Sequence, residues 1–541
     1  MLQSDITGKR RVIPRWRRFS STPTSELVSA RSAAPYLDTD EIPLLRALER
    51  WNSERTVGRA IEVVNQALIS ETPAKGLAAA HYILAEGATP TDAVRITADR
   101  LVHGQKNVEI GNFAIDVMND GERFGFVQKE IGRLKSRLRL YPNNALEWLE
   151  VARLQCTIGQ PKSARKAIRN ALIYAPENRL VLRATARFMM HDDDPEQALW
   201  ALRKSEAVRY DPWIQAAEIA VSSVMGKRSK ILKVGKNLLQ RTSLSAHQTS
   251  ELASALATEE LLSGDTRGAN RHFKMSLVSP TDNSVAQAVW AENMGIQHLK
   301  PNPNSVANAF EGRMQKSIQD EEFEEAFLQS VYWLSDESYS VMPARMGSYI
   351  ADSHLKNYNK AIEVADVGLI ANPHDLSLKN NKTVSLAHLG LLDEAVITFE
   401  PIAKLVKSTQ SGIDPTYLAT AGLLEFRRGN SQQGRDLYEG AVIESRKLGH
   451  IAKAFRAKIH WLLEEMHVKE ISADAINKVM KRMDDDVKYL KEIEGDDAKS
   501  FWSSTKLEIE KNIQHIIASR KTENEDAIIG RALTSAANDE V

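Results

Sequence analysis

Three side chains near residue 460 have a spacing that could bind a metal ion. His460, Glu464 and His467 lie at i, i+4 and i+7, so they would share one face of a helix. Glu464 and His467 also have the Glu-x-x-His spacing of helical metal bundles. Such a bundle needs ligands from a facing helix, and the sequence holds no second motif of this kind. We therefore expect a solvated helix face here, no metal site and no cofactor.

The other signals for catalysis are incomplete. Gly226-Lys227-Arg228-Ser229 lacks the upstream glycine that a phosphate-binding loop requires. The sequence contains no glycine-rich dinucleotide fingerprint, no Gly-x-Ser-x-Gly and no His-Glu-x-x-His. Asp192-Asp193-Asp194 precedes Pro195 and fits an inter-helix loop, because aspartate caps the helix that follows. These observations predict that the chain is not an enzyme.

The composition indicates a folded globular protein without disulfides. The chain has 541 residues, 43% of them hydrophobic, with 71 basic and 71 acidic residues. A single cysteine, Cys156, excludes an internal disulfide and a thiolate zinc site, and we expect it to be a half-exposed filler rather than a redox group. No uncharged apolar stretch reaches about 18 residues, so we expect no membrane span.

Positive charge is concentrated at the N-terminus. Residues 1–35 carry seven basic residues against two acidic ones, which leaves 64 basic and 69 acidic residues in positions 36–541. We expect residues 1–38 to form a flexible basic arm. One alternative is a mitochondrial transit peptide with Arg17-Arg18-Phe19-Ser20-Ser21 as its processing site, and another is a docking arm that uses Trp16 and Phe19. We otherwise expect a cytoplasmic protein.

Small residues recur in the helical stretches at intervals of about 34 positions. Ala164 and Ala198 stand one such interval apart, and Ala326, Ala361 and Ala395 follow at nearly the same spacing. Such a period in a helical pattern indicates a helix–turn–helix solenoid. In the clearest unit, two apolar stripes of helical spacing are separated by Gly159 and ended by Pro176.

This unit resembles the tetratricopeptide repeat (TPR). Trp148, Ala152, Ala164, Ile168, Ala171 and Pro176 occupy the signature positions of that family. The resemblance implies an all-α fold, an α-α superhelix in which paired helices cross at small residues and each unit packs on the next. The residues that carry this repeat signature are Trp148, Ala152, Gly159, Ala164, Ala171, Pro176, Ala198, Ala361, Pro373, Gly390 and Ala395.

Breaks in the pattern suggest the domain organisation. The Pro/Asn run Leu299 to Asn304 interrupts the repeat, since each proline disfavours helix before it. We expect the following parts: a basic arm (1–38), an N-terminal solenoid segment (39–298), a linker (299–304), a C-terminal solenoid segment (305–450), a helical cap (451–520) and a tail (521–541).

The resemblance also implies where a partner would bind. In the family the first helix of each pair lines a concave groove, and the matching positions here include Arg153, Arg183 and Arg187, with Asn119 from a poorly matching unit. Three arginines suit a carboxylate-bearing peptide, although solvated arginines explain them equally well. A second possible face lies around Asn380 and Asn381. The lysine and asparagine pattern of chaperone-tail binders is not met, because Met346, Ile350, Thr416 and Thr420 stand at its other positions.

The leading hypothesis for function is therefore a non-enzymatic scaffold that binds a protein or peptide, with an acidic partner favoured. The first alternative is a helical-repeat protein that binds RNA, which the net acidic body disfavours. The second is a sensor or regulatory subunit of an enzyme complex. The identity of the partner and the oligomeric state are not fixed by the sequence.

Overall fold

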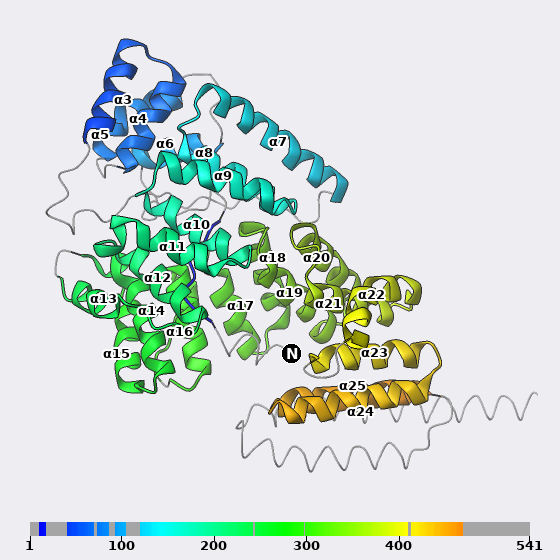
Figure 1. Ribbon diagram of the computed structural model, residues 1–541. Coiled ribbons are helices and arrows are strands. Elements are labelled where there is room, and N and C mark those ends of the chain that lie inside the picture. The colour runs from blue at the N-terminus through cyan, green and yellow to red at the C-terminus, as the bar shows by residue number, and fades with distance from the viewer. Residues whose placement is uncertain are drawn as a thin grey trace, which may run out of the picture. The chain divides into compact units, whose positions relative to one another are not determined.

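All regular elements that the structure describes are helical. The computed structural model describes residues 10–17, 41–69, 73–85, 92–103, 120–241, 244–296, 298–408 and 413–468. Within these ranges the chain contains no strand (Figure 1). It divides into two compact units, Leu2–Leu378 and Lys379–Val541, the second grouped with Met1. No helix in the described ranges has both the length and the apolar character needed to cross a bilayer.

The first unit holds most of the helices. They are α3 (Glu41–Ser53), α4 (Val57–Ile69), α5 (Pro73–Ala85), α6 (Asp92–His103), α7 (Asp120–Leu140), α8 (Ala145–Thr157), α9 (Pro161–Tyr174), α10 (Arg179–His191), α11 (Pro195–Lys204), α12 (Pro212–Val224), α13 (Leu232–Leu239), α14 (Ala246–Leu262), α15 (Thr266–Ser276), α16 (Asp282–Asn293), α17 (Phe310–Gln319), α18 (Phe323–Asp336), α19 (Val341–Tyr349) and α20 (Tyr358–Ala371). Short helical turns at Glu206–Arg209, Pro303–Ser305 and Ile350–His354 supplement them.

The second unit begins within α21 (Leu376–His388). It continues through α22 (Leu392–Ser408), α23 (Pro415–Arg427), α24 (Ser431–Lys447) and α25 (Ile451–His467). The last helix contains the predicted start of the cap, and the rest of the expected cap, residues 469–520, lies outside the described residues.

Consecutive helices pack as pairs with the predicted period. Helices α8 and α10 begin at residues 145 and 179, one repeat interval apart. Each begins with an asparagine cap, since the side chains of Asn144 and Asn178 accept hydrogen bonds from backbone N–H groups of the first turn. Gly159 ends the first helix with φ 67°, and a Cβ there would lie 2.6 Å from the carbonyl oxygen of Ile370. The α-α superhelix predicted from the sequence is confirmed.

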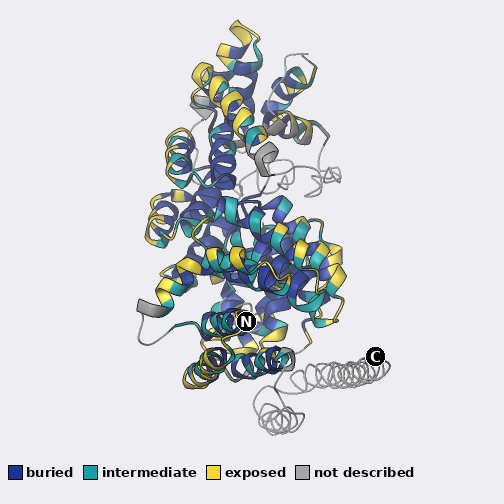
Figure 2. Ribbon diagram, turned by 90° about the vertical axis from the view of Figure 1, so that its right-hand side faces the viewer, coloured by how far each residue is buried: buried dark blue, intermediate teal, exposed yellow. Residues whose placement is uncertain are grey.

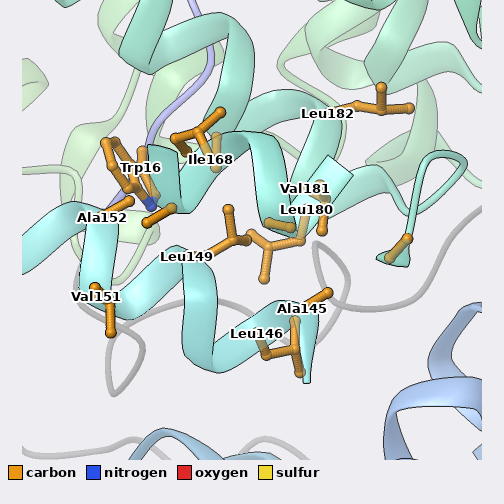
Figure 3. Packing of buried hydrophobic residues seen from close by; sticks show 14 of the residues in the cluster. Trp16, Ala145, Leu146, Leu149, Val151, Ala152, Ile168, Leu180, Val181 and Leu182 are labelled. Carbon is orange, nitrogen blue, oxygen red and sulfur yellow. The ribbon is translucent and has the colours of Figure 1, made fainter. Parts of the chain in front are cut away.

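The small residues of the repeat lie where the paired helices cross. Ala152, Ala164, Ala198, Ala361 and Ala395 are all fully buried. Figure 3 shows Ala152 facing Ile168 of the paired helix, with Leu149 and Leu180 filling the space to the next pair. Because no helix pair buries its own apolar face, the pairs are stable only as a stack.

The remaining signature positions bound the helices. The indole N–H of Trp148 donates to the Pro142 carbonyl at 2.6 Å, which ties the first turn of α8 to the chain before it. Ala171 is buried, whereas Pro176 and Pro373 are exposed just after helix ends. Gly390 has φ 78° at the turn between α21 and α22.

The superhelix of the first unit curves back on itself. Thr157 of α8 shares a hydrogen bond with Ser338, and Arg187 of α10 donates to Tyr339 and Ser340. These contacts join α8 and α10 to the loop that follows α18, far later in the chain. Figure 2 shows that many of the helices consist largely of buried residues. The Pro/Asn segment at 299–304, expected as a linker, lies inside this unit, and Pro303 packs beside Gly312.

Candidate functional site

The inner helices of the first unit have no exposed groove face along much of their length. Every residue of α12 from Pro212 to Ser222 is buried, and so is every residue of α16 from Asp282 to Ala291. In an open solenoid the first helix of each pair would leave one side in solvent. Something must therefore cover that side.

Part of the cover is the chain's own N-terminus. Residues 10–17, hereafter the inner segment, run as an extended strip among these helices (Figure 1). Val12, Arg15, Trp16 and Arg17 are each less than 9% exposed. The expectation of a flexible arm is therefore wrong for these residues, because their basic side chains find carboxylates that are distant in sequence. The rest of the arm lies outside the described residues.

Arg10 forms a two-pronged contact with Glu311 of α17. Its Nε and Nη2 donate to the two carboxylate oxygens, both at 2.8 Å. The same guanidinium also donates to the side-chain oxygens of Asn283 and Gln287 on α16. This fork geometry suits arginine and cannot be reproduced by a lysine.

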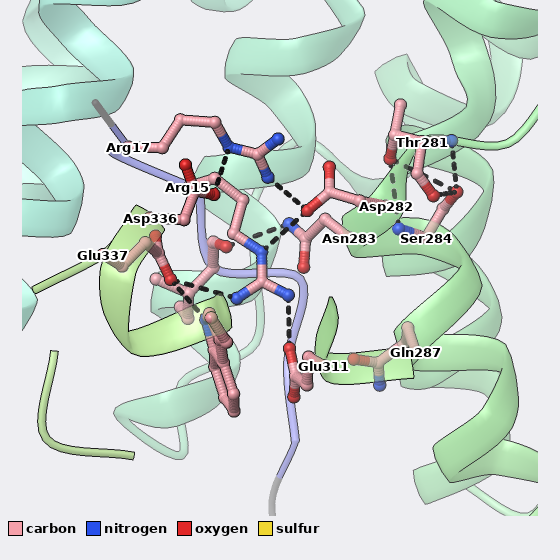
Figure 4. Close-up of polar contacts among 12 residues, drawn as sticks. Arg15, Arg17, Thr281, Asp282, Asn283, Ser284, Gln287, Glu311, Asp336 and Glu337 are labelled. Atoms are coloured by element: carbon pink, nitrogen blue, oxygen red, sulfur yellow. Dashed lines mark hydrogen bonds and ion pairs between the residues drawn. The ribbon is translucent and has the colours of Figure 1, made fainter. Parts of the chain in front are cut away.

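Arg15 lies at the centre of the site (Figure 4). Its guanidinium forms ion pairs with Asp282 at 3.1 Å, with Glu337 at 3.3 Å and with Glu311. Its Cζ also lies 5.4 Å from the ring centroid of Trp333, a cation–π distance. All three carboxylates are distant from Arg15 in sequence, so tertiary folding alone brings them together.

Arg17 completes a row of charges. It pairs with Asp282 and, at 3.5 Å, with Asp336. We call the four acidic residues the carboxylate site: Asp282, Glu311, Asp336 and Glu337. Asp282 also sits in the first turn of α16, where the helix dipole favours a negative charge.

The backbone of the inner segment is held as well. Asn283 donates its amide N–H to the Ile13 carbonyl at 2.9 Å, and Gln287 donates to the Arg10 carbonyl at 3.0 Å. The Trp16 backbone N–H donates to Glu337 at 3.2 Å. Side-chain amides that pair with an extended backbone can bind a peptide of any sequence. The carboxylates make the binding specific, because they pair only with basic side chains.

Trp16 provides the apolar anchor. Its ring lies edge-on to Phe188 of α10 at 6.2 Å between centroids, and 5.1 Å from Tyr339. Figure 3 shows it next to Ala152 and Ile168 in the largest core cluster. Buried aromatic pairs of this kind add to the free energy gained from area alone.

The charges in this site are mutually compensated. Burial by itself would raise the pKa of Asp282, Glu311 and Glu337, but the attraction of the arginines outweighs it, so all three pKa values lie below their usual range. Burial would likewise lower the pKa of Arg15, and its three carboxylates raise it well above normal. Asp282, Glu311, Glu337 and Arg15 are therefore all charged at neutral pH.

The predicted groove arginines lie on the predicted helices but have internal partners. Arg183 is fully buried, forms two hydrogen bonds to Glu251 at 2.7 and 3.2 Å, and stacks 4.7 Å from the Trp213 ring. Arg153 pairs with Glu150. Arg187 donates to Tyr339 and Ser340. The expectation that Arg183 faces a partner is wrong, because the curvature of the unit encloses it.

The predicted asparagines do not join this site. Asn119 lies outside the described residues. Asn380 and Asn381 lie on α21, where Asn380 is buried and Asn381 is half-buried. Both belong to the second unit, so their role as a binding face stays a prediction.

The other residues considered for chemistry in the sequence have structural roles. Asp194 caps α11, and both Asp192 and Asp194 pair with Arg165. Cys156 is 1% exposed rather than half-exposed, and burial raises the pKa of its thiol. Glu464 is 4% exposed and pairs with Arg427, so the expectation of a solvated helix face is wrong at this residue, whereas His460 is exposed. In the described ranges no group of three His, Cys, Asp or Glu side chains is arranged to hold a metal ion.

Sequence reasoning missed the carboxylate site. Its members are scattered between positions 282 and 337, and no local motif joins them. One signal was available, because a basic arm of net +5 stands against an acidic body of net −5. Equal and opposite net charges of the arm and the body are what ion pairing between them would require.

No protein-family model matches the chain, and neither does any curated protein. Among solved structures, the TPR domain of P58(IPK) is similar over 72% of this chain and 98% of that chain, with 14% identity and a TM-score of 0.21. The helix pairs, their period and their buried small residues carry the assignment. The described helices form an α-solenoid of paired helices whose period and buried small residues resemble the tetratricopeptide repeat.

Proposed function

We propose that this chain is a non-enzymatic interaction scaffold and that the inner face of its first unit binds an extended segment of a partner protein. One observation supports this above all others: residues 10–17 lie there as an extended peptide. Both their backbone and their side chains are held by residues from α16, α17 and the loop after α18. Helical-repeat grooves bind extended peptides in this manner.

The inner segment resembles a bound peptide ligand that is covalently connected to its receptor. Its only internal backbone hydrogen bond described is from Ile13 N–H to the Arg11 carbonyl, so its conformation depends on the solenoid. Tethering raises the effective concentration of such a segment to the millimolar range. A partner segment must therefore compete with it or arrive when it has been displaced.

The charges of the site weigh against RNA as the ligand. Phosphate groups would meet the carboxylate site and be repelled. They also weigh against an acidic peptide, because the guanidinium groups of Arg183 and Arg153 already pair with Glu251 and Glu150. No described group supports a catalytic role for the chain.

Binding of a peptide in trans tests this proposal. The full chain carrying R15A and R17A is titrated with a labelled peptide of residues Gly8–Phe19, and fluorescence anisotropy is followed. Saturable binding with one peptide per chain is expected. Absence of binding by the folded variant at concentrations of about 1 mM, the range that tethering supplies, would contradict the proposal.

A further inference from the structure

The contacts of the inner segment define the class of partner more closely. We propose that the inner face is a receptor for arginine-rich segments of a partner protein with the pattern Arg-x-x-x-x-Arg-aromatic-Arg, and that the chain's own arm is the resident competitor. This inference rests on the function proposed above. The pattern is that of Arg10, Arg15, Trp16 and Arg17.

The site is selective for arginine over lysine. Glu311 receives a two-pronged contact from Arg10 and a further contact from Arg15. The Arg15 guanidinium meets three carboxylates in three directions and also stacks on Trp333. A lysine ammonium is a point charge with three donors and no plane, so it satisfies only part of this set.

The spacing within the pattern follows from extended geometry. Alternate side chains of an extended chain point to opposite sides, so Arg15 and Arg17 share one side and Trp16 takes the other. Both arginines contact Asp282, while Trp16 lies between Phe188 and Tyr339. A segment with the same residues in another order would place a charge against the aromatic rings.

Exchange of the inner segment for a partner segment is more favourable than a state in which the site is empty. Removal of the inner segment would leave Asp282 and Glu311 without their arginines, although their side chains are only 6% and 11% exposed. Uncompensated buried charges are strongly unfavourable. An incoming arginine-rich segment therefore replaces the arm rather than filling a vacant groove, and the arm holds the site ready in its absence.

A panel of four peptides tests this specificity on the full-length R15A/R17A chain. They are the native Gly8–Phe19 sequence, its version with every arginine changed to lysine, its version with alanine for Trp16, and a scrambled version. We expect the native peptide to bind and each of the others to bind at least about tenfold more weakly, as the loss of a bidentate or buried aromatic contact implies.

A substitution in the receptor supplies the matched comparison. E311Q, added to the R15A/R17A chain, should weaken the native peptide about tenfold or more, whereas E363Q, at an exposed carboxylate of α20, should leave its affinity unchanged. If the R15A/R17A chain does not fold alone, the peptides are added during refolding. Recovery of helical signal with the native but not the scrambled peptide then supports the proposal.

The outcomes separate the two proposals. Failure of all four peptides to bind overturns the peptide-binding function itself. Equal binding of the native and lysine peptides would support peptide binding but overturn the selectivity for arginine. Equal binding of the scrambled peptide overturns the pattern. Formation of a dimer in which arms exchange between copies, without any effect of added peptide, would identify a second copy of this chain as the occupant and overturn a separate partner.

Discussion

Replacement of Arg15 by methionine should destabilise the first unit strongly. Methionine retains much of the apolar stem beneath Trp333 but removes the guanidinium. Glu311 keeps Arg10 and Asp282 keeps Arg17. Glu337 loses its direct ion pair and keeps the N–H donors of Trp16 and Trp333, with the charges of Arg187 and Arg17 nearby. Removal of one partner from a buried ion pair costs about 3–5 kcal/mol, and we expect a loss in this range.

The measurement is urea unfolding of the full chain, followed by far-ultraviolet circular dichroism at neutral pH. R169M is the matched control, because Arg169 is an exposed arginine on α9 and its loss should change the free energy of unfolding by less than about 0.5 kcal/mol. The double variant R15M/E337Q should recover part of the R15M loss, since glutamine leaves no unpaired charge.

The cost should also depend on pH. The pKa values of Asp282, Glu311 and Glu337 are lowered in the folded state, so their stabilisation is complete above the unfolded-state pKa of about 4 and is lost as pH falls through the lower folded values. Protonated acids no longer need the guanidinium, and the gap between R15M and the unmodified chain should narrow in acid. A neutral-pH loss no larger than that of R169M would refute the buried-pair reasoning.

Three further outcomes are expected. W16A should lower the free energy of unfolding by about 3–5 kcal/mol, and W200A, at a 55% exposed tryptophan, by far less; equal losses would contradict burial of Trp16. A361L should cost about 1–3 kcal/mol by forcing a larger side chain between crossed helices, and a neutral effect in thermal unfolding would mean that the crossing is elsewhere. Burial and the charge of Arg187 lower the pKa of His191 from 6.5 to about 4, so the unfolded chain binds a proton that the folded chain does not in that window. Stability should therefore decrease as pH falls from 6.5 to about 4, and an H191N chain whose unfolding midpoint decreased as steeply would exclude His191 as the cause.

The repeat architecture could be predicted from the sequence because its determinants are local. Ala164 and Ala361 are small since two helices cross there, and Gly159 ends a helix by adopting positive φ. Asn144 and Asn178 cap the helices that they precede. Each of these requirements involves residues within one or two neighbouring helices, so the repeat period records them directly.

The groove arginines show where this local reasoning ended. The repeat register predicted that Arg153, Arg183 and Arg187 line a groove, and the structure has them on α8 and α10. It could not show that Arg183 meets Glu251, 68 positions later, or that the unit curves until Arg187 contacts Tyr339. Curvature accumulates from small rotations between successive pairs, and no single repeat encodes it.

The sequence by itself determined the helix pairs, their period and the separation of charge between a basic arm and an acidic body. Only the tertiary structure decided that the two charges meet. Arg15 pairs with acids 267, 296 and 322 positions away, and each of these contacts depends on the packing of every pair between them. Long-range ion pairs leave no periodic trace in a sequence, because their geometry is set by the whole superhelix and not by any one turn of it.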